Sequence, residues 1–188
     1  YYLDNTPTHA YMKHLYKYPQ AAYPYEDLIN TNRNRNKFEK EFELLDTDLF
    51  NEGKYFDVFT EYAKNDTEDL CIKITAHNRG NDAAYLALLP TLWLRNLWSF
   101  GLMHEKSAMY LKEGGSNYGE VKVDHYWVGD YHFYFEKPVR TLFTENETNT
   151  QRLYEQPNPS SYVKDAFHTA VIENRFEWLK KKKEGTKF

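Results

Sequence analysis

The feature that most restricts the fold of this chain is the alternation of apolar and polar residues in several short segments. The clearest case is residues 70–77, where one set of alternate positions reads Leu70, Ile72, Ile74 and Ala76 and the other reads Cys71, Lys73, Thr75 and His77. Successive side chains of a strand point to opposite faces of a sheet, so this segment predicts a half-buried antiparallel strand. Turn residues follow at 78–82, and the apolar run at residues 83–93 predicts the second strand of a hairpin.

Other segments predict further strands and a few short helices. Short apolar runs between turn signals predict strands at residues 42–46, 55–62, 121–127, 131–136 and 140–143. Helical spacing predicts helices at residues 8–18, with Thr8 as N-cap, at the start of residues 24–40, and at residues 160–178. Several short strands with closely spaced turns are typical of two packed antiparallel sheets. We therefore expect a mainly β fold, an antiparallel β-sandwich of the supersandwich kind with a few short helices.

The two ends of the chain predict that it is part of a larger protein. The sequence starts on the apolar run Tyr1-Tyr2-Leu3, as if a strand were already in progress, and residues 185–188 carry no terminal cap. From this pattern we expect residues 1–188 to form a single β-sandwich accessory domain, an incomplete fragment of a longer chain.

Charge and cysteine content restrict the class of partner. The net charge is −4 and the sequence pI is about 6.0, whereas a general nucleic-acid-binding protein carries a basic excess. No apolar run approaches the roughly 20 residues of a membrane-spanning helix, so we expect no membrane partner either. The only cysteine, Cys71, allows no disulfide within the chain, which favours a reducing compartment such as the cytoplasm.

Side-chain motifs give no complete catalytic signature. The sequence has no GxSxG, no HExxH and no glycine-rich phosphate loop. Its seven histidines are scattered, and we expect neither a metal nor a cofactor. Glu145 and Glu147 are two residues apart, which on a strand places both carboxylates on one face about 7 Å apart, a spacing that suits the acid and base of a glycosidase. The alternative is that they join Asn146 and Asn149 in hydrogen bonds that fix a loop.

Aromatic residues make up 18% of the chain, which favours both β-sheet packing and stacking on the apolar faces of sugar rings. One aromatic cluster, residues 90–98, includes Trp93, Arg95 and Trp98. Because Trp and Arg are the residues most often found at the energetic centre of interfaces, this cluster predicts an interface or a ligand surface. The alternative is that both indoles lie in the core and Arg95 pairs with an acid.

Several long stretches, taken together, resemble one enzyme family. They are LDNTPTHAYMKHLYKYPQAAYPYEDL (residues 3–28), ELLDTDLF (43–50), YFDVFTEYAK (55–64), TAHNRG (75–80), LLPTLWLRNLW (88–98), LFTENETNTQRL (142–153) and YVKDAFH (162–168). In this order they resemble the N-terminal region of bacterial proteins related to family 63 glycoside hydrolases, the glucosidase and mannosylglycerate hydrolase-like group. The matches cover most of the chain.

The resemblance implies a fold and indicates which domain carries the catalytic residues. Members of this family are inverting glycosidases that act on α-linked sugars, with a β-sandwich before an (α/α)₆ barrel that carries both catalytic carboxylates. It implies that this chain is a non-catalytic region that docks on a C-terminal barrel of the same polypeptide and shapes its pocket rim. The implied interdomain or pocket-rim residues are Trp93, Arg95, Asn96, Trp98, Glu145, Asn146, Glu147, Asn149, Lys164, Asp165 and His168.

Two alternatives for the function remain open from the sequence. An independent carbohydrate-binding module would need an exposed patch of planar aromatics, for which Trp93, Trp98, Trp127 and Tyr131 are the candidates. A protein-interaction domain with no sugar role would instead show an exposed apolar patch.

Overall fold

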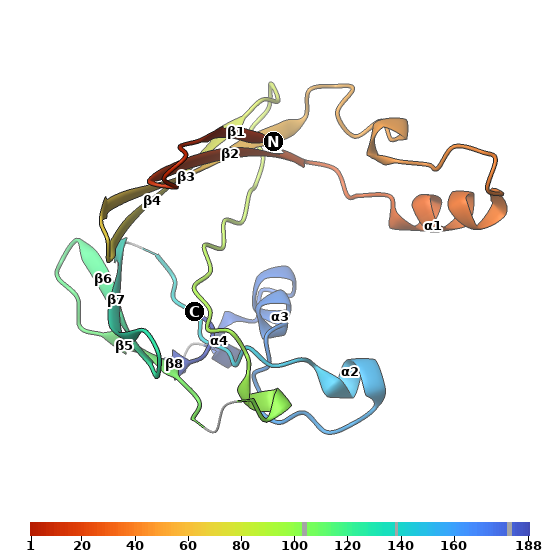
Figure 1. Ribbon diagram of the computed structural model, residues 1–188. Helices are drawn as coiled ribbons and strands as arrows, with labels where there is room; N and C mark the ends of the chain where they lie inside the picture. The colour runs from red at the N-terminus through yellow and green to blue at the C-terminus, as the bar shows by residue number, and fades with distance from the viewer. Residues whose placement is uncertain (103–104, 138, 180–181) are drawn as a thin grey trace. The chain divides into compact units, whose positions relative to one another are not determined.

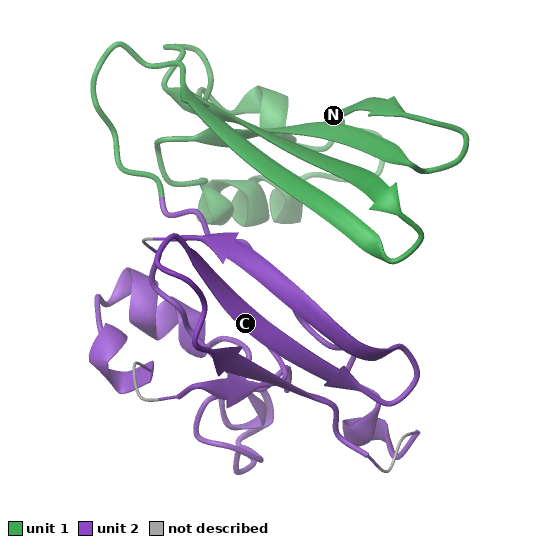
Figure 2. Cartoon of the chain, turned by 90° about the vertical axis from the view of Figure 1, so that its left-hand side faces the viewer, with its two compact units in different colours: residues 1–86 green, residues 87–188 purple. Residues whose placement is uncertain are grey.

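The structure is a computed structural model, and it describes residues 1–102, 105–137, 139–179 and 182–188. The chain divides into two compact units, residues 1–86 and residues 87–188, which are shown in different colours in Figure 2. Each unit contains one four-stranded antiparallel sheet, and the helices are short (Figure 1). The prediction of a mainly β chain with a few short helices is therefore confirmed. The single sandwich domain over residues 1–188 stays a prediction.

The first unit is a meander in which each strand pairs with the next along the chain. Its strands are β1 (Tyr2–Asn5), β2 (Tyr11–Pro19), β3 (Tyr55–Asp66) and β4 (Asp69–Asn78), in the spatial order β1-β2-β3-β4. Helix α1 (Tyr25–Asn34) and the 3₁₀ turn η1 (Leu44–Asp46) lie in the connection between β2 and β3 (Figure 1). The long β2–β3–β4 ladder is the framework of this unit.

Two predictions for this unit are wrong. Residues 8–18 are not a helix: strand β2 occupies this segment, and the hydroxyl of Thr6 accepts hydrogen bonds from the backbone N–H groups of Ala10 and Tyr11 to close the β1–β2 turn. The helical spacing of Tyr11, Leu15 and Tyr18 was misleading, because tyrosines also favour strands and β3 offers a full-length partner. Residues 42–46 form no strand either, since the Glu43 and Asp46 side chains cap the 3₁₀ turn at Leu44–Asp46.

The register of the first sheet gives it two different faces. Tyr16 pairs with Val58, and Val58 pairs with Ala76, so these residues share one face. The same register places a mixed but largely apolar set on that face: Met12, His14, Tyr16, Tyr18, the buried Phe56, Val58, Thr60, Tyr62, Lys64, Leu70, Ile72, Ile74, Ala76 and Asn78. The opposite face carries ion pairs, above all the Asp57 carboxylate between Lys17 at 2.8 Å and Arg79 at 2.6 Å. The predicted alternation in residues 70–77 is confirmed, but Leu70 and Ile72 are exposed rather than half-buried.

The second unit has a sheet of the order β7-β6-β5-β8 and three short helices. The strands are β5 (Ala108–Lys112), β6 (Tyr118–His125), β7 (Gly129–Glu136) and β8 (Glu184–Gly185), with η2 at Trp98–Phe100. The helices are α2 (Thr150–Tyr154), α3 (Ala166–Ile172) and α4 (Phe176–Leu179). Figure 1 shows α2 and α3 on the chain between β7 and β8.

The buried apolar clusters of the described residues both lie in the second unit. One cluster lines the inner face of the sheet and contains Leu94, Met109, Val121, Val123 and Phe143, with the rings of Phe133, Phe135 and Phe188 packed against it. The other, Leu142, Ala166, Ala170 and Leu179, holds α3 and α4 together. The segment that links the two clusters, residues 142–143, leads directly into Glu145 and Glu147.

Three further predictions fail in this unit. Residues 83–93 form no hairpin strand with β4; instead Leu92 exchanges two backbone hydrogen bonds with Phe188, because the C-terminal segment supplies the partner. Residues 140–143 form no strand, and pairing starts only at Thr144, which bridges Lys187. Residues 160–178 do not form one helix, because Asn174 adopts a left-handed φ of 55° between α3 and α4.

Candidate functional site

Residues 144–147 lie between two other backbone segments of the second unit. The carbonyl of Thr144 accepts hydrogen bonds from the backbone N–H groups of Thr186 and Lys187, and the N–H of Glu145 donates to the carbonyl of Tyr162 at 2.7 Å. Both neighbours are far away in sequence, so the segment is held on two sides by tertiary contacts. The carboxylates of Glu145 and Glu147 both reach the Lys106 ammonium, as expected for side chains two residues apart on an extended backbone.

The Glu145 carboxylate is held by three hydrogen-bond donors. It receives the ammonium groups of Lys106 and Lys182, each at 2.8 Å, and the hydroxyl of Thr186 at 3.0 Å. Burial by itself raises the pKa of this carboxyl, but the hydrogen bonds from Lys106 and Lys182 outweigh burial and hold the pKa below its ordinary value. Glu145 is therefore ionised near neutral pH and is unsuited to act as the protonated acid of a glycosidase.

The Glu147 carboxylate is more deeply buried and is bound through one oxygen. Its side chain is 8% exposed, and Oε1 accepts hydrogen bonds from the indole N–H of Trp98 at 2.9 Å and from Lys106 at 3.1 Å. The second oxygen, Oε2, is buried without a hydrogen-bond partner among the described residues. The Lys106 ammonium also lies 5.5 Å from the centre of the Trp98 ring, an arrangement that adds a cation–π attraction. Of the two interpretations of this carboxylate pair, the contacts favour a loop fixed by hydrogen bonds.

Asn96 and Asn146 join the tryptophan segment to the glutamate segment. The Asn96 amide donates to the carbonyl of Asn146 at 2.9 Å, and the Asn146 amide donates to the carbonyl of Leu94 at 2.8 Å. The backbone N–H of Asn146 also donates to the hydroxyl of Thr186 at 2.7 Å. Two clusters that look separate in the sequence are thus one network, which we call the Lys106 network: Asn96, Trp98, Lys106, Glu145, Asn146, Glu147, Lys182 and Thr186.

Trp93 and Arg95 alternate with the buried Leu94 and have exposed side chains. Trp93 forms an isolated backbone bridge with Lys187. Within the described residues the Arg95 side chain makes no ion pair with the Lys106 network, so the alternative in which Arg95 pairs with a nearby acid finds no support there. These two residues lie next to the network in sequence but on the solvent side.

Asn149, Asp165 and His168 line an open pocket of about 400 Å³. Its wall is formed by Asn149, Gln151, Arg152, Asn158, Ser161, Val163, Asp165, Ala166, His168, Thr169, Ile172, Glu173 and Trp178. We call this space the α2–α3 pocket, because most of these residues belong to α2, to α3 and to the loop between them. The volume falls in the range of about 300–1,000 Å³ that is usual for small-molecule sites.

Asn149 connects most of the polar groups in the pocket wall. Its amide N–H₂ donates to both carboxylate oxygens of Asp165, at 3.1 and 3.2 Å, and its carbonyl accepts from the Asn158 amide at 3.1 Å. The same carbonyl caps α2 by accepting the backbone N–H of Arg152 at 3.0 Å. The Arg152 guanidinium lies 3.7 Å from Asp165.

Lys164 lies between the Lys106 network and the pocket and contributes through its backbone. Its N–H donates to the carbonyl of Glu147 at 3.1 Å, and its carbonyl accepts from the Lys187 ammonium at 3.4 Å. Burial and the nearby Lys164 charge lower the pKa of the Lys187 ammonium. The Lys164 side chain itself is exposed.

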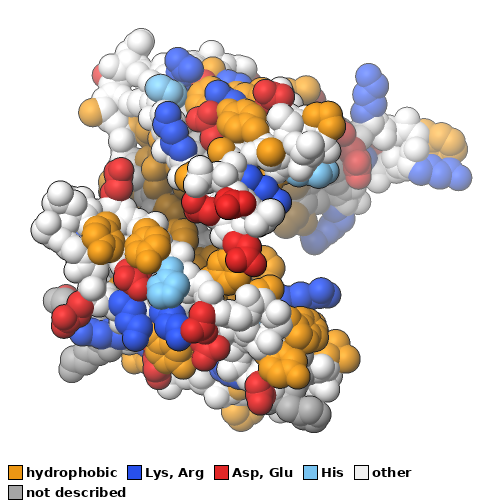
Figure 3. Space-filling model, turned by 60° about the vertical axis from the view of Figure 1, so that its left-hand side comes forward, with side chains coloured by type: hydrophobic (Ala, Val, Ile, Leu, Met, Phe, Trp, Pro, Cys, Tyr) orange, Lys and Arg blue, Asp and Glu red, His pale blue; other side chains and the backbone are white. Residues whose placement is uncertain are grey.

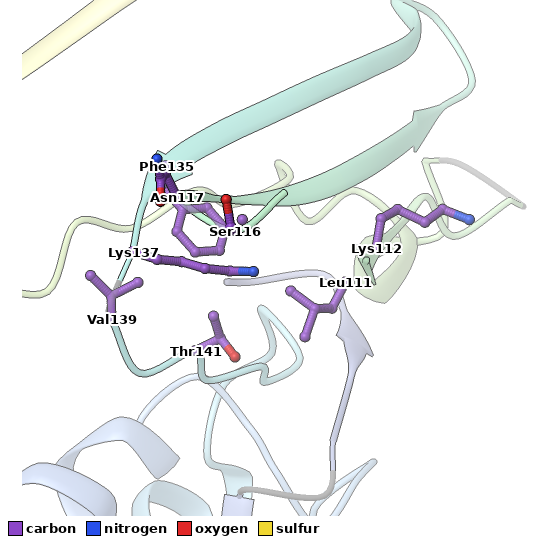
Figure 4. A pocket seen from close by; sticks show the side chains of 9 residues that line it. Leu111, Lys112, Ser116, Asn117, Phe135, Lys137, Val139 and Thr141 are labelled. Atoms are coloured by element: carbon purple, nitrogen blue, oxygen red, sulfur yellow. The ribbon is translucent and has the colours of Figure 1, made fainter. Parts of the chain in front are cut away.

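A second pocket of the same unit lies at one end of the sheet, with a volume of about 520 Å³ (Figure 4). Leu111, Phe135 and Val139 give it an apolar wall, and the Lys137 chain extends into it while its ammonium donates to the carbonyl of Gly115 at 3.1 Å. None of the residues predicted for the site lines this pocket.

The sequence reasoning missed the cations and several pocket residues. Lys106 and Lys182 are 39 and 37 residues away from Glu145. Lys182 belongs to the lysine run at 180–183, and neither a run of this kind nor a single lysine carries a sign of a distant partner. Arg152 and Asn158 follow Asn149 closely, and an Asn before a short helix is a recognisable N-cap signal that could have indicated them.

Searches of the described part of the chain gave two further results. In residues 1–102, 105–137, 139–179 and 182–188, no group of three or more His, Cys, Asp or Glu side chains is arranged to hold a metal ion. Within the same ranges, no helix has the length and apolar character needed to cross a membrane.

Comparison with known proteins gives one relative. A protein of Saccharomyces cerevisiae named "Uncharacterized protein YMR196W" is 35% identical over 219 residues, which cover 100% of this chain and 20% of the yeast protein. The chain is thus homologous to that protein over its full length and spans about one fifth of the relative's length. No protein-family model and no solved structure matches the chain.

Proposed function

We propose that this chain is the non-catalytic, N-terminal β region of a glycoside hydrolase of the family 63 kind, cytoplasmic and acting on α-linked sugars. In this proposal it docks on a catalytic (α/α)₆ barrel of the same polypeptide and shapes the rim of the barrel's pocket. The ordered series of motifs from residues 3–28 to residues 162–168 supports the family. The length of the yeast homologue, of which this chain covers 20%, supports a larger parent protein.

The apolar face of the β1–β4 sheet is the observation that carries the docking role. Tyr16 is 60% exposed, Leu70 55% and Ile72 49%, although all three lie on the face that the register makes apolar. No buried apolar cluster of the described residues belongs to this unit. A contiguous exposed apolar face of this kind marks an interaction surface, because leaving it in water sacrifices roughly 25 cal/mol for each Å².

The Lys106 network supports the non-catalytic part of the proposal. A glycosidase needs one protonated and one free carboxyl group near the scissile bond. Glu145 and Glu147 share the Lys106 ammonium, and the hydrogen bonds of Glu145 hold its pKa below the ordinary value. The network instead fixes residues 144–147 and, through the backbone of Lys164, one border of the α2–α3 pocket. A segment fixed in this way suits the proposed role at the rim of the barrel's pocket.

Docking can be tested by comparing the thiol reactivity of two neighbouring positions in the full-length parent polypeptide. Cys71 and Ile72 are adjacent on β4 but point to opposite faces, and Cys71 is exposed. The natural thiol at position 71 is compared with Ile72→Cys in a Cys71→Ser background, using a maleimide and peptide mapping. We expect position 72 to react at least tenfold more slowly. Equal rates at the two positions would show that the apolar face is not covered.

The hydrolase part is tested on the same full-length polypeptide. A panel of α-linked glucosides and mannosides is incubated with it, and the anomer first released is identified by proton NMR. We expect hydrolysis with inversion, and Glu145→Gln should retain hydrolysis after correction for the folded fraction. Absence of hydrolysis over the whole panel would remove the enzymatic proposal, and a selective loss of turnover in the folded Glu145→Gln variant would contradict the non-catalytic role.

An independent carbohydrate-binding module is the second proposal, and the exposure of two indoles favours it. Trp93 is 56% exposed and Trp127 is 64% exposed. Trp98 speaks against the module, since the indole N–H donates to Glu147 and the ring lies against the Lys106 ammonium. Retention of the full-length protein on a glucan-containing gel, lost in Trp93→Ala or Trp127→Ala, would favour the module over the docking role.

A further inference from the structure

The α2–α3 pocket has the chemistry of a small-molecule site, and three of the pocket-rim residues predicted from the sequence, Asn149, Asp165 and His168, line it. Its floor includes Val163 and Ala166, which are buried, and Ala166 belongs to the cluster that fixes α3 against α4. The pocket is therefore formed by a packed part of the second unit and not by loops alone. Side chains on such a support keep their positions when a ligand binds, which lowers the entropic cost of binding.

The polar groups of the pocket are held in place before any ligand arrives. Asp165 accepts both N–H bonds of the Asn149 amide, and Asn149 is held in turn by Asn158 and by the backbone of Arg152. Asn158 is fixed by the hydroxyl of Thr150 at 3.2 Å and the N–H of Gln151 at 3.0 Å. Each carboxylate oxygen of Asp165 can accept further hydrogen bonds beyond the one from Asn149. Asp165 is thus an oriented acceptor with free capacity.

The charges of the wall argue against an anionic ligand. The guanidinium of Arg152 lies 3.7 Å from Asp165, so its charge is already partly balanced. The other wall carboxylate, Glu173, is 3.3 Å from Arg175. The wall thus holds two carboxylates and one guanidinium, and a phosphate or carboxylate ligand would meet as much repulsion as attraction.

The remaining wall groups match a neutral ligand with many hydroxyls. Amides, hydroxyls and the imidazole of His168 offer both donors and acceptors. The indole of Trp178, 38% exposed and packed on Tyr162 at 5.0 Å, supplies an aromatic surface on which the C–H groups of a sugar ring can rest. From this combination we infer that the α2–α3 pocket binds a neutral sugar, with Asp165 and Arg152 holding its hydroxyls and Trp178 its apolar face.

All of the wall residues named for this site belong to this chain, and the inference does not rest on the hydrolase proposal. The test uses the full-length polypeptide with diazirine-bearing methyl α-glucoside and methyl α-mannoside as photoreactive probes. The labelled peptides are mapped by mass spectrometry, so labelling here is distinguished from labelling in any other part of the protein. Unlabelled methyl glycosides and inorganic phosphate serve as competitors.

We expect labelling within residues 149–178 that the methyl glycosides displace and phosphate does not. Asp165→Asn keeps one acceptor oxygen for the Asn149 amide and removes the second oxygen and the charge. It should weaken the labelling about tenfold or more, because a sugar hydroxyl then loses its hydrogen bond to a charged acceptor. Arg152→Gln should act in the same direction, and because Arg152 is 71% exposed this variant also covers the case in which Asp165→Asn fails to fold. The matched control is Asp130→Asn, an exposed carboxylate paired with Lys122 on the sheet.

Three outcomes would overturn the inference. They are labelling of the folded protein only outside residues 149–178, displacement by phosphate instead of by sugar, and a response of Asp165→Asn and Arg152→Gln no larger than that of Asp130→Asn. Hydrolysis of α-glycosides is measured in parallel, and its presence or absence leaves this test unchanged.

Discussion

Removing the Lys106 ammonium tests whether Glu145 and Glu147 belong to a structural network. The Lys106 ammonium lies 2.8 Å from the Glu145 carboxylate and 3.1 Å from the Glu147 carboxylate. Lys106 stands two residues before strand β5. Lys106→Met keeps most of the side-chain length and deletes the charge. Glu145 then still has Lys182 and Thr186, whereas Glu147 keeps only the indole N–H of Trp98.

The size of the effect follows from the exposure of the three groups. Loss of one partner of a buried ion pair costs about 3–5 kcal/mol, and loss of an exposed pair costs about 0–1 kcal/mol. The side chains of Glu145 and Glu147 are 12% and 8% exposed, but that of Lys106 is 40% exposed. Solvent screening at the ammonium places the expected loss between the two limits, at about 2 kcal/mol.

Native-state hydrogen exchange measures this loss locally in the full-length protein. The reporters are the backbone N–H groups of Glu145 and Asn146, which are bound to Tyr162 and to Thr186. Lys106→Met should speed exchange of both, and adding Glu147→Gln should restore about 1 kcal/mol or more, since the neutral amide no longer needs the cation. The control is Lys112→Met, an exposed lysine on β5. An effect of Lys106→Met within about 0.5 kcal/mol of the control would refute the network.

The pH dependence of the same reporters has a definite sign. The pKa of Glu145 is lower in the folded protein than its ordinary value of 4.5, so the carboxylate contributes stability above that value. That contribution disappears as the pH falls through the lower folded pKa. Burial lowers the pKa of Lys106, but the hydrogen bonds that its ammonium donates to Glu145 and Glu147 outweigh burial and raise the pKa above 10.5. Its contribution is complete below 10.5 and is lost as the pH rises through the raised value.

Three further substitutions have defined outcomes. Asp57→Asn should destabilise the first unit by roughly 1–3 kcal/mol, because its carboxylate is 7% exposed between Lys17 and Arg79; urea unfolding at pH 7 measures this, and no change would contradict it. Burial raises the pKa of Asp57, but hydrogen bonds from Lys17 and Arg79 lower it below 3.8, so acid removes this contribution only below that value. Gly119→Ala should cost about 1–3 kcal/mol in thermal unfolding, since the added Cβ would overlap the Phe135 ring; wild-type stability would show that the ring moves freely. Thr144→Val should be neutral or stabilising by up to about 1 kcal/mol in the same assay, because the buried Thr144 hydroxyl has no partner among the described residues; a clear loss would reveal a hidden one.

Local sequence signals predicted those parts of the fold that depend on neighbours in the chain. The alternation in residues 70–77 and the hairpin of β6 and β7 could be predicted, because a hairpin needs only a tight turn and matched period-two patterns. Strand β2 could not be predicted in this way, since the spacing of its tyrosines fits a helix as well as a strand. Only the long ladder with β3 decides between the two structures. The same holds for residues 83–93, whose partner proved to be the C-terminal segment.

The candidate site shows the same division between local and distant information. By itself the sequence determined a mainly β chain with few helices. It also marked a group of unusual polar density: Glu145, Asn146, Glu147, Asn149, Lys164, Asp165 and His168. Only the tertiary structure decided what these residues do, because ion pairing and burial depend on partners tens of positions away. Lys106 and Lys182 balance the charges of the two glutamates. The packing of α3 against α4 supports the pocket that Asn149 and Asp165 line.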